Sequence, residues 1–294
     1  MLIAAPNLSE GRDADSIEAV TAGFIAAAEL LDRHSDGVHN RTVLTLRAPA
    51  GELREALAGG AAACAERIDM RRHRGAHPCV GALDVCPVVF PDAGDRESAR
   101  REVLAAAELI AALEIPVFLY GDLASEPGRR ERAHFRDGGL ATLAQRMRSG
   151  ELRPDLGPAA LHPRAGATLV TARPPLAAFN VELADADLAL ARRIAAELRE
   201  SGGGPAGVRA IGIDMGDGRM QVSANVHDPI AVPLAEVVAR IRRLAKPHGA
   251  RPVAAEIVGL VPVAALEGFP EEVPIAGFDP ERHLLERRAR PASG

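Results

Sequence analysis

The sequence is poor in several residue types: it contains no tryptophan, one tyrosine and three cysteines, and Lys246 is its only lysine. Cys64, Cys79 and Cys86 cannot build a disulfide framework, which fits a reducing cytosol. No apolar run approaches the roughly 18 residues of a membrane-spanning helix. The chain becomes polar by Asn7, too early for a signal peptide. We therefore expect a cytoplasmic protein that does not enter a membrane.

The bulk composition favours a soluble globular protein with two compact units. Hydrophobic residues make up 47% of the chain and charged residues 26%, as in ordinary globular domains. The net charge is −5 and no basic tract stands out, so a nucleic-acid partner is not expected. A chain of 294 residues exceeds what one core usually organises. The abundance of arginine over lysine leaves many planar groups suited to binding carboxylates.

Short apolar runs alternate with amphipathic segments in the first half. Strands are expected at 2–6, 30–35, 41–48 and 82–90, with helices over 13–29 and 51–68. This order is βαββαβ, the order of the ferredoxin-like unit. The pattern then predicts a helix over 95–114, a strand at 116–121 and a helix over 133–148.

The second half repeats this order. Strands are expected at 178–183, 208–215, 219–226 and 253–259, and helices over 185–201 and 233–249. We predict an α/β (α+β) fold of two ferredoxin-like βαββαβ subdomains, each a mixed sheet backed by helices, with a ligand crevice between them. The predicted domains are 1–175 and 176–294. From about Gly268 the chain is rich in proline and arginine, which predicts an irregular peripheral segment.

Residues 70–87, MRRHRGAHPCVGALDVCP, gather two histidines and two cysteines. The histidines are four residues apart, a spacing that would serve one metal ion only on a helix. Gly75 and Pro78 favour a loop instead, and no C-x-x-C pair is present, so we expect no metal. Cys86 lies in an apolar run and Cys79 between proline and valine, which favours packing over nucleophilic chemistry for both.

A histidine on this loop is a candidate proton carrier. Gly75 permits unusual backbone angles and Pro78 stiffens the loop, which would hold His77 in a fixed direction. Imidazole titrates near neutral pH and suits general acid–base catalysis. The alternative is a loop histidine that only bonds a backbone carbonyl.

Other polar residues cluster at predicted strand ends. The segments PNLSEGRD (6–13) and HSDGVHNR (34–41) both lie there, although solvated turns explain many such residues. The segment DLGPAALHPRAGATLVTARPP (155–175) has no phosphate-loop or dinucleotide motif. It contains a strand-like stretch, ATLVTA (167–172), and otherwise suits either a shaped loop for a flat ring system or a linker.

Five motifs in this order resemble the glutamate formimidoyltransferase (formiminotransferase) family: PNLSEGRD, LLDRHSDGVHNRTVLTL, IDMRRHRGAHPCVGALDVCP, DLGPAALHPRAGATLVTARPPLAAFNVEL and AEIVGLVP. They span residues 6–262. The resemblance implies two α/β subdomains with tetrahydrofolate, the co-substrate, in a tunnel between them. It implies transfer of the formimidoyl group from N-formimidoyl-L-glutamate to N5 of tetrahydrofolate in histidine degradation and one-carbon metabolism.

The resemblance also implies roles for single residues. The family's catalytic histidine, in its G-x-H-P motif, corresponds to His77. The folate-binding loop corresponds to Gly157, Pro158, Ala159, Ala160, Leu161, His162, Pro163, Arg164, Ala165 and Gly166, of which His162 and Arg164 are candidates to contact the glutamate tail of folate. Supporting polar roles fall on His34, Asp36 and Asn40. The two carboxylates of the substrate call for arginine forks, for which Arg41, Arg74 and Arg173 are the candidates.

The chain departs from the animal members of the family in two ways. Where they have an acidic residue after LLDV, this chain reads LLDRHSD, so that role would pass to His34 or Asp36. The animal enzyme is fused to a cyclodeaminase, for which 294 residues leave no room, so a separate protein would process the product.

Three alternative functions remain open at this stage. One is formyl transfer between 5-formyltetrahydrofolate and glutamate at the same site. The others are a non-catalytic folate-binding protein and a zinc hydrolase. A homodimer would be unsurprising.

Overall fold

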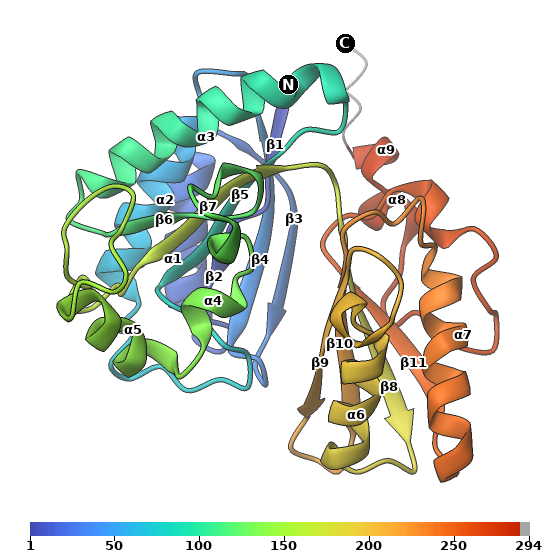
Figure 1. Cartoon of the computed structure of the whole chain (residues 1–294). Coiled ribbons are helices and arrows are strands. Elements are labelled where there is room, and N and C mark those ends of the chain that lie inside the picture. Colours follow the sequence, from blue (N-terminus) through green and yellow to red (C-terminus); the bar gives the residue numbers. More distant parts are fainter. Residues whose placement is uncertain (289–294) are drawn as a thin grey trace. The chain divides into compact units, whose positions relative to one another are not determined.

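The computed structural model describes residues 1–288, which form two compact units that divide between Pro174 and Pro175 (Figure 1). The first unit contains a seven-stranded sheet. Its strands are β1 (Leu2–Ala4), β2 (Asn7–Leu8), β3 (Glu29–Asp36), β4 (Arg41–Ala48), β5 (Leu83–Val89), β6 (Val117–Leu119) and β7 (Thr168–Arg173).

The strand order of this sheet gives a mixed arrangement. Both β1 and β2 pair with β4 on one side and β5 on the other, so they occupy one row interrupted at Ala5 and Pro6. Strand β3 pairs with β4, which gives the antiparallel part β3-β4-β1/β2-β5. Strands β7 and β6 extend the sheet in parallel beyond β5.

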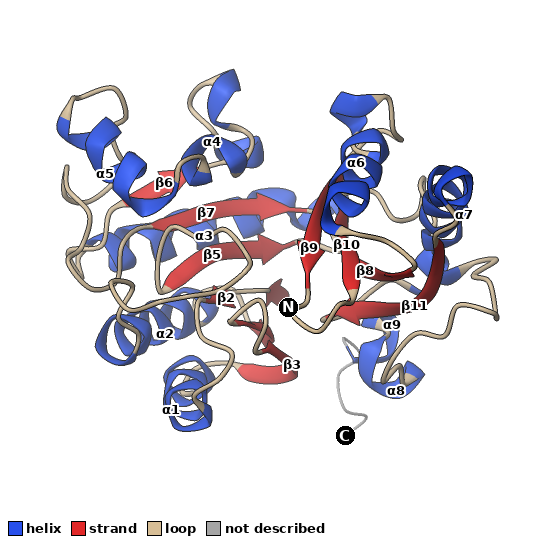
Figure 2. Cartoon of the chain, turned by 90° about the horizontal axis from the view of Figure 1, so that it is seen from below, coloured by secondary structure: helices blue, strands red, loops and turns tan. Residues whose placement is uncertain are grey.

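Helices cover both faces of the sheet (Figure 2). Helices α1 (Ala14–Ile25), α2 (Leu53–Arg67) and α3 (Arg96–Ala111) pack side by side on one face. The shorter α4 (Ala133–Arg136) and α5 (Gly139–Arg148) lie on the other.

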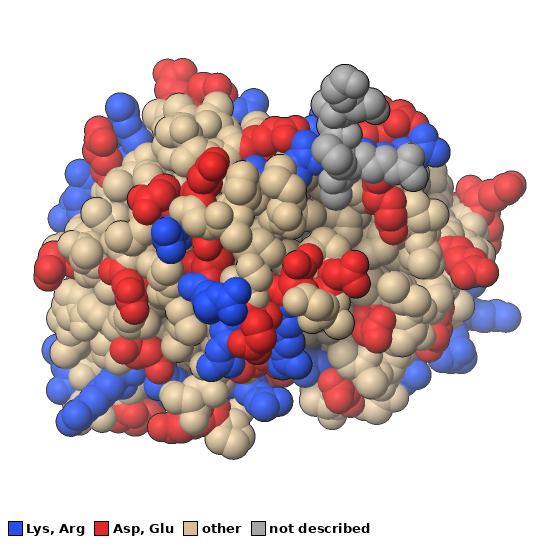
Figure 3. All heavy atoms as spheres, turned by 90° about the horizontal axis from the view of Figure 1, so that it is seen from above, with Lys and Arg blue, Asp and Glu red and all other residues tan. Residues whose placement is uncertain are grey.

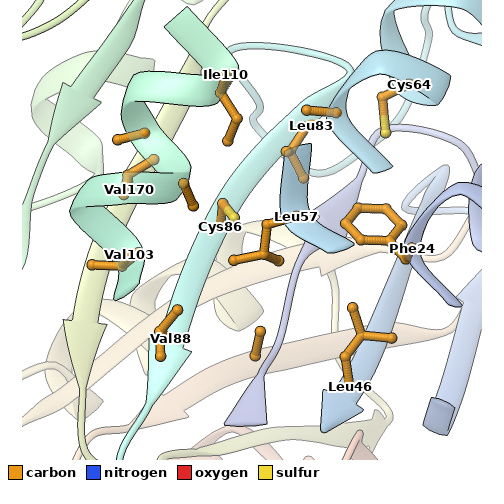
Figure 4. Close-up of a cluster of buried hydrophobic side chains, with 14 of the residues drawn as sticks. Phe24, Leu46, Leu57, Cys64, Leu83, Cys86, Val88, Val103, Ile110 and Val170 are labelled. Carbon is orange, nitrogen blue, oxygen red and sulfur yellow. The ribbon is translucent and has the colours of Figure 1, made fainter. Parts of the chain in front are cut away.

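The main core lies between the sheet and helices α1–α3. Figure 4 shows Phe24, Leu57 and Cys86 pointing into it, and each is completely buried. Each large side chain of this kind stabilises the fold by roughly 1.5–3 kcal/mol. The next residue along from Cys86, Val85, points the opposite way into a second cluster with Phe118 under α4 and α5. Strand β5 is therefore buried on both faces, as its apolar sequence predicts.

One helix boundary differs from the prediction. The helix expected over 133–148 is split, because α4 ends at Arg136 and α5 begins at Gly139. Gly138 and Gly139 have φ angles of 71° and 70°, in the left-handed region that interrupts a right-handed helix. The split leaves α4 as a single turn.

The second unit has a four-stranded antiparallel sheet in the order β11-β8-β10-β9. Its strands are β8 (Ala177–Ala184), β9 (Val208–Asp214), β10 (Met220–Val226) and β11 (Arg251–Val258). Helices α6 (Leu188–Leu198) and α7 (Leu234–Ala245) cover one face (Figure 1). The predicted fold class, mixed α/β with two sheets backed by helices, is confirmed, and both strand orders are compatible with the ferredoxin-like unit.

The segment from Gly268 is irregular up to Asp279, as predicted, but the prediction that it is peripheral is wrong for several of its apolar residues. Val273 and Leu284 are buried in the second core, and the chain forms parallel bridges from Ile275 to Ala255 and from Leu284 to Val261. The segment then forms two single-turn helices, α8 (Pro280–His283) and α9 (Leu285–Arg288). Its prolines prevent long helices, but the apolar residues between them are still buried. The predicted tail beyond 288 lies outside the described residues.

The surface carries charges of both signs. On the face shown in Figure 3, basic and acidic side chains are interspersed. Among residues 1–288, no helix is long and apolar enough to cross a membrane.

Candidate active site

His77 lies on the loop between α2 and β5, and this loop packs against the turn between β3 and β4. The backbone N–H of Ala76 donates to the carbonyl of Val38 at 3.2 Å. The Asn40 side chain donates to the carbonyl of Arg74 at 3.0 Å and accepts from the N–H of Gly11 at 2.9 Å. Asn40 is buried and has a φ of 50°, which asparagine tolerates better than most residues. It ties three segments together and thereby fixes the start of the His77 loop.

Gly75 is required here for space and not for an unusual backbone angle. Its φ is not positive, so the expectation of special backbone angles is wrong. A Cβ atom at this position would lie 2.3 Å from the carbonyl oxygen of His39. The loop can approach the β3–β4 turn this closely only because residue 75 has no side chain.

Both ring nitrogens of His77 are engaged. Nδ1 lies 2.8 Å from the carbonyl oxygen of Pro78, and Nε2 lies 2.9 Å from Nη1 of Arg41. A carbonyl can only accept and a guanidinium can only donate. We therefore infer that Nδ1 carries the proton and that Nε2 presents its lone pair to Arg41.

The surroundings favour the neutral form of His77. Burial lowers its pKa well below the ordinary value of 6.5, and the positive charges of Arg41, Arg136 and Arg132 lower it further. At pH 7 the ring is therefore neutral, with a lone pair available to accept a proton.

Four guanidinium groups lie in this part of the first unit: Arg41, Arg132, Arg136 and Arg173, which we call the arginine cluster. Burial lowers the pKa of Arg41 to about 10 and that of Arg173 to about 10. Burial also lowers the pKa of Arg132, and the charge of Arg136 adds to this effect. The four side chains are partly buried, and positive charges that repel one another away from bulk water are costly unless an anion joins them.

Only part of this charge is balanced within the chain. Asp84, which is 1% exposed, pairs with Arg136. Arg173 donates to the carbonyl of Pro174 at 2.9 Å, and Arg132 makes no side-chain hydrogen bond within residues 1–288. The arginine cluster thus keeps an excess of positive charge that suits an anion such as a carboxylate.

The cluster surrounds the single tyrosine of the chain. Tyr120 is buried, and burial raises its pKa, although the charges of Arg132, Arg173 and Arg136 act in the opposite direction. Its hydroxyl therefore remains protonated at neutral pH and can donate a hydrogen bond.

Sequence reasoning missed Arg132 and Arg136. Both belong to the segment GRRERAHFR (128–136), in which arginines recur at short spacing. That spacing could have marked them as candidates for the site. Arginine is so common in this chain, however, that the sequence does not separate these two from the other arginines, and only the fold around α4 does.

The three predicted substrate arginines lie in different surroundings. Arg41 contacts His77, and Arg173 belongs to the arginine cluster. Arg74 is exposed and donates to the carbonyl of its neighbour His73. The structure therefore groups two of the three.

Asp36 and His34, predicted to support His77, occupy the end of β3. Asp36 Oδ2 lies 2.6 Å from Nδ1 of His39, and Oδ1 accepts from the N–H groups of Val38 and His39. Burial alone would raise the pKa of Asp36, but these hydrogen bonds outweigh it and lower the pKa to about 2. Asp36 thus acts on His39 and not directly on His77. His34 pairs across the strands with Val43, and its side chain has contacts of its own.

The predicted folate loop, 157–166, is a well-defined turn braced by backbone hydrogen bonds. The backbones of His162 and Gly166 bond each other at 3.0 Å in both directions. The Nδ1 atom of His162 accepts from the N–H groups of Arg164 and Ala165, and Arg164 donates to the carbonyl of Glu66. His162 and Arg164, the two residues predicted to contact the glutamate tail of folate, therefore both make hydrogen bonds within the protein.

The cysteines carry no nucleophile character. Burial raises the pKa of Cys86 to about 12 and that of Cys79 to about 12, and Cys64 is buried as well. Within residues 1–288, no three His, Cys, Asp or Glu side chains lie together in a way that could hold a metal ion.

Comparison with known proteins covers nearly the whole chain. Residues 1–173 match the model of the formiminotransferase domain, N-terminal subdomain, and residues 178–269 match the model of the formiminotransferase domain. The chain is 36% identical to a glutamate formimidoyltransferase of Streptococcus pyogenes over 96% of both chains. It is 33% identical to a glutamate formimidoyltransferase of Thermoplasma acidophilum over 98% of this chain and 97% of the relative.

A longer relative gives the same assignment. The chain is 35% identical to the formimidoyltransferase-cyclodeaminase of Sus scrofa, of which the match covers 50%. Two family models in succession and full-length relatives above 30% identity agree, and the chain therefore belongs to the formiminotransferase family.

Proposed function

We propose that this protein transfers the formimidoyl group from N-formimidoyl-L-glutamate to N5 of tetrahydrofolate, with His77 as the general acid and base. The observation that carries the proposal is a neutral imidazole beside a partly buried, positively charged cluster, in a chain similar over nearly its full length to glutamate formimidoyltransferases. A substrate with two carboxylates and a proton transfer need these two features together.

The reaction requires one proton to move between two nitrogens. N5 of tetrahydrofolate attacks the amidine carbon and forms a tetrahedral intermediate. His77 Nε2 takes the proton from N5, and the resulting imidazolium returns it to the glutamate nitrogen as the carbon–nitrogen bond breaks. General acid–base catalysis of this kind is typically worth about 10²–10⁴-fold.

Arg41 couples substrate binding to the basicity of His77. In this structure its guanidinium occupies the lone pair of Nε2 at 2.9 Å. A carboxylate is a stronger acceptor for a guanidinium than a neutral imidazole nitrogen. When a substrate carboxylate draws Arg41 toward itself, Nε2 becomes free to accept the N5 proton.

The remaining guanidiniums serve the two carboxylates. Arg173 and Arg132 contact neither a carboxylate nor His77 within residues 1–288, which supports a role in binding the glutamate moiety. For tetrahydrofolate we retain the loop 157–166, because backbone hydrogen bonds brace its turn and it lies within the part of the chain that matches the N-terminal formiminotransferase subdomain. No step of this reaction needs a metal ion.

The test is a turnover assay with purified protein. N-formimidoyl-L-glutamate with tetrahydrofolate should react, and we expect this reaction to exceed formyl transfer from 5-formyltetrahydrofolate to glutamate. His77→Ala should lower kcat by at least about 10²-fold while tetrahydrofolate still binds. His248→Ala, at an exposed site in the second unit, is the matched control. Near-normal turnover by His77→Ala would remove His77 from the mechanism.

A further inference from the structure

His39 is a buried histidine, and one of its ring nitrogens has no hydrogen-bond partner among residues 1–288. Its residue is 6% exposed, and its Nδ1 is held by the ionised carboxylate of Asp36 at 2.6 Å. Its Nε2 is fully buried and has no hydrogen-bond partner among residues 1–288. Leaving a buried polar atom unpaired costs about 1–3 kcal/mol.

The ring of His39 lies against the ring of His77. The two centroids are 6.2 Å apart and the rings meet edge to face at 70°. The backbone carbonyl of His39 also limits how the loop carrying His77 can approach, since Gly75 packs directly on it. The side chain and backbone of His39 thus both border the loop that presents His77.

We propose that His39, anchored by Asp36, is a positioning residue for His77. It restricts rotation of the His77 ring so that Nδ1 stays on the carbonyl of Pro78 and Nε2 stays toward the substrate. The arrangement follows the logic of a carboxylate–imidazole pair that orients a catalytic group. The proposal rests on the proposed function, because it assigns a second histidine to the same proton transfer.

His39 also affects the charge of His77. The groups that act on the His77 ring are Arg41 from β4, Arg132 and Arg136 from the start and end of α4, and His39 from the β3–β4 turn. All four disfavour a positive charge on His77. A neutral side chain at position 39 removes one of these influences and raises the pKa of His77. The acid limb of kcat/KM, which requires neutral His77, then moves to higher pH.

The decisive variant is His39→Asn. Its amide can still donate to Asp36 and hold the turn, but it lacks the ring that contacts His77. We expect kcat to fall about 10–100-fold, by analogy with the loss seen when a group that orients a metal-bound histidine is removed. KM for both substrates should stay within about twofold, and the acid limb should move to higher pH. His248→Asn is the control. The proposal would be overturned if folded His39→Asn had the kcat of the wild type and the acid limb of its kcat/KM profile lay at the same pH.

A second measurement does not depend on turnover. Nitrogen-15 chemical shifts of the His77 ring report which nitrogen carries the proton and how the ring titrates. In the wild type we expect protonated Nδ1, and in His39→Asn a mixture of tautomers with a raised pKa. Should His39→Asn not fold, Asp36→Asn tests the same anchor with an almost unchanged shape. Identical His77 shifts in wild type and variant would overturn the positioning role, whereas absence of turnover in the wild type would overturn only the proposed function.

Discussion

Within residues 1–288, Asp84 is the one carboxylate that forms an ion pair with the arginine cluster, and we expect its removal to destabilise the first unit strongly. One oxygen accepts the N–H of Val80 at 2.7 Å, and the other pairs with Arg136. The side chain is 1% exposed, and the charges of Arg41 and Arg132 lie close enough to be affected by it. Asp84→Asn keeps the shape and the acceptor for Val80 but deletes the negative charge.

The expected loss follows from the burial of the pair. Removing one partner of a buried ion pair costs about 3–5 kcal/mol, because the other charge stays buried without compensation. Here that charge, on Arg136, would also repel the rest of the cluster. Since natural domains are stable by only about 5–15 kcal/mol, this is a large fraction of the total. For a unit of this size it corresponds to a Tm lower by roughly 6–20 °C.

The chain offers its own probe for the measurement. Tyr120 is the only tyrosine and there is no tryptophan, so tyrosine fluorescence during urea unfolding reports the first unit alone. Asp84→Asn and Arg136→Gln should each be strongly destabilised. The double variant should recover at least half of the loss, because neither charge is then left unpaired. A loss below about 1 kcal/mol for Asp84→Asn, or additive losses in the double variant, would refute the reasoning.

Three further predictions address the site itself. Arg132→Gln should raise KM for N-formimidoyl-L-glutamate about tenfold, since charged hydrogen bonds contribute about 1.5–3 kcal/mol. The same change at the exposed Arg148 should leave KM unchanged. Equal effects of the two substitutions would exclude Arg132 from substrate binding. Because the pKa of His77 is lowered, kcat/KM should persist as the pH falls and decline only below about 6.5, so a pH profile with its acid limb above 6.5 would contradict this base. Gly166→Ala should destabilise the fold by at least about 1 kcal/mol, because the φ of Gly166 is 73° and the new Cβ would lie 2.4 Å from a backbone oxygen. The control is Gly128→Ala, whose new Cβ meets nothing within 4 Å. Equal melting temperatures for the two variants would contradict this packing.

The Gly166 prediction shows how the structure changes an expectation from sequence. From the motif alone, a bulky residue at position 166 should weaken folate binding selectively. The structure places Gly166 in a left-handed turn against the backbone of Val80. A substitution there therefore strains the fold first, and the affinities for both substrates should fall together.

The sequence by itself determined the alternation of elements and the family. Apolar periodicity reports local burial, and it predicted the long strands of both sheets and the helices that cover them, apart from the break between α4 and α5. The five motifs identified the family because their order along the chain is specific. His77 was singled out by its loop, since Gly75 and Pro78 are local signals. Two adjacent glycines, Gly138 and Gly139, also indicate the break between α4 and α5, although the predicted helix ran through them.

Only the tertiary structure decided how the side chains combine. It brings Arg132 and Arg136, at the two ends of α4, together with Arg41 from β4 and Arg173 from β7, although these residues are spread over more than a hundred positions. It shows that Asp36 holds His39 and that Arg41 occupies the nitrogen of His77. Local periodicity carries no information on such contacts, because they arise from strand pairing and loop packing between distant segments. The chemistry of a site depends on these distances. The sequence therefore singled out His77 as a candidate, and the fold supplied its neighbours.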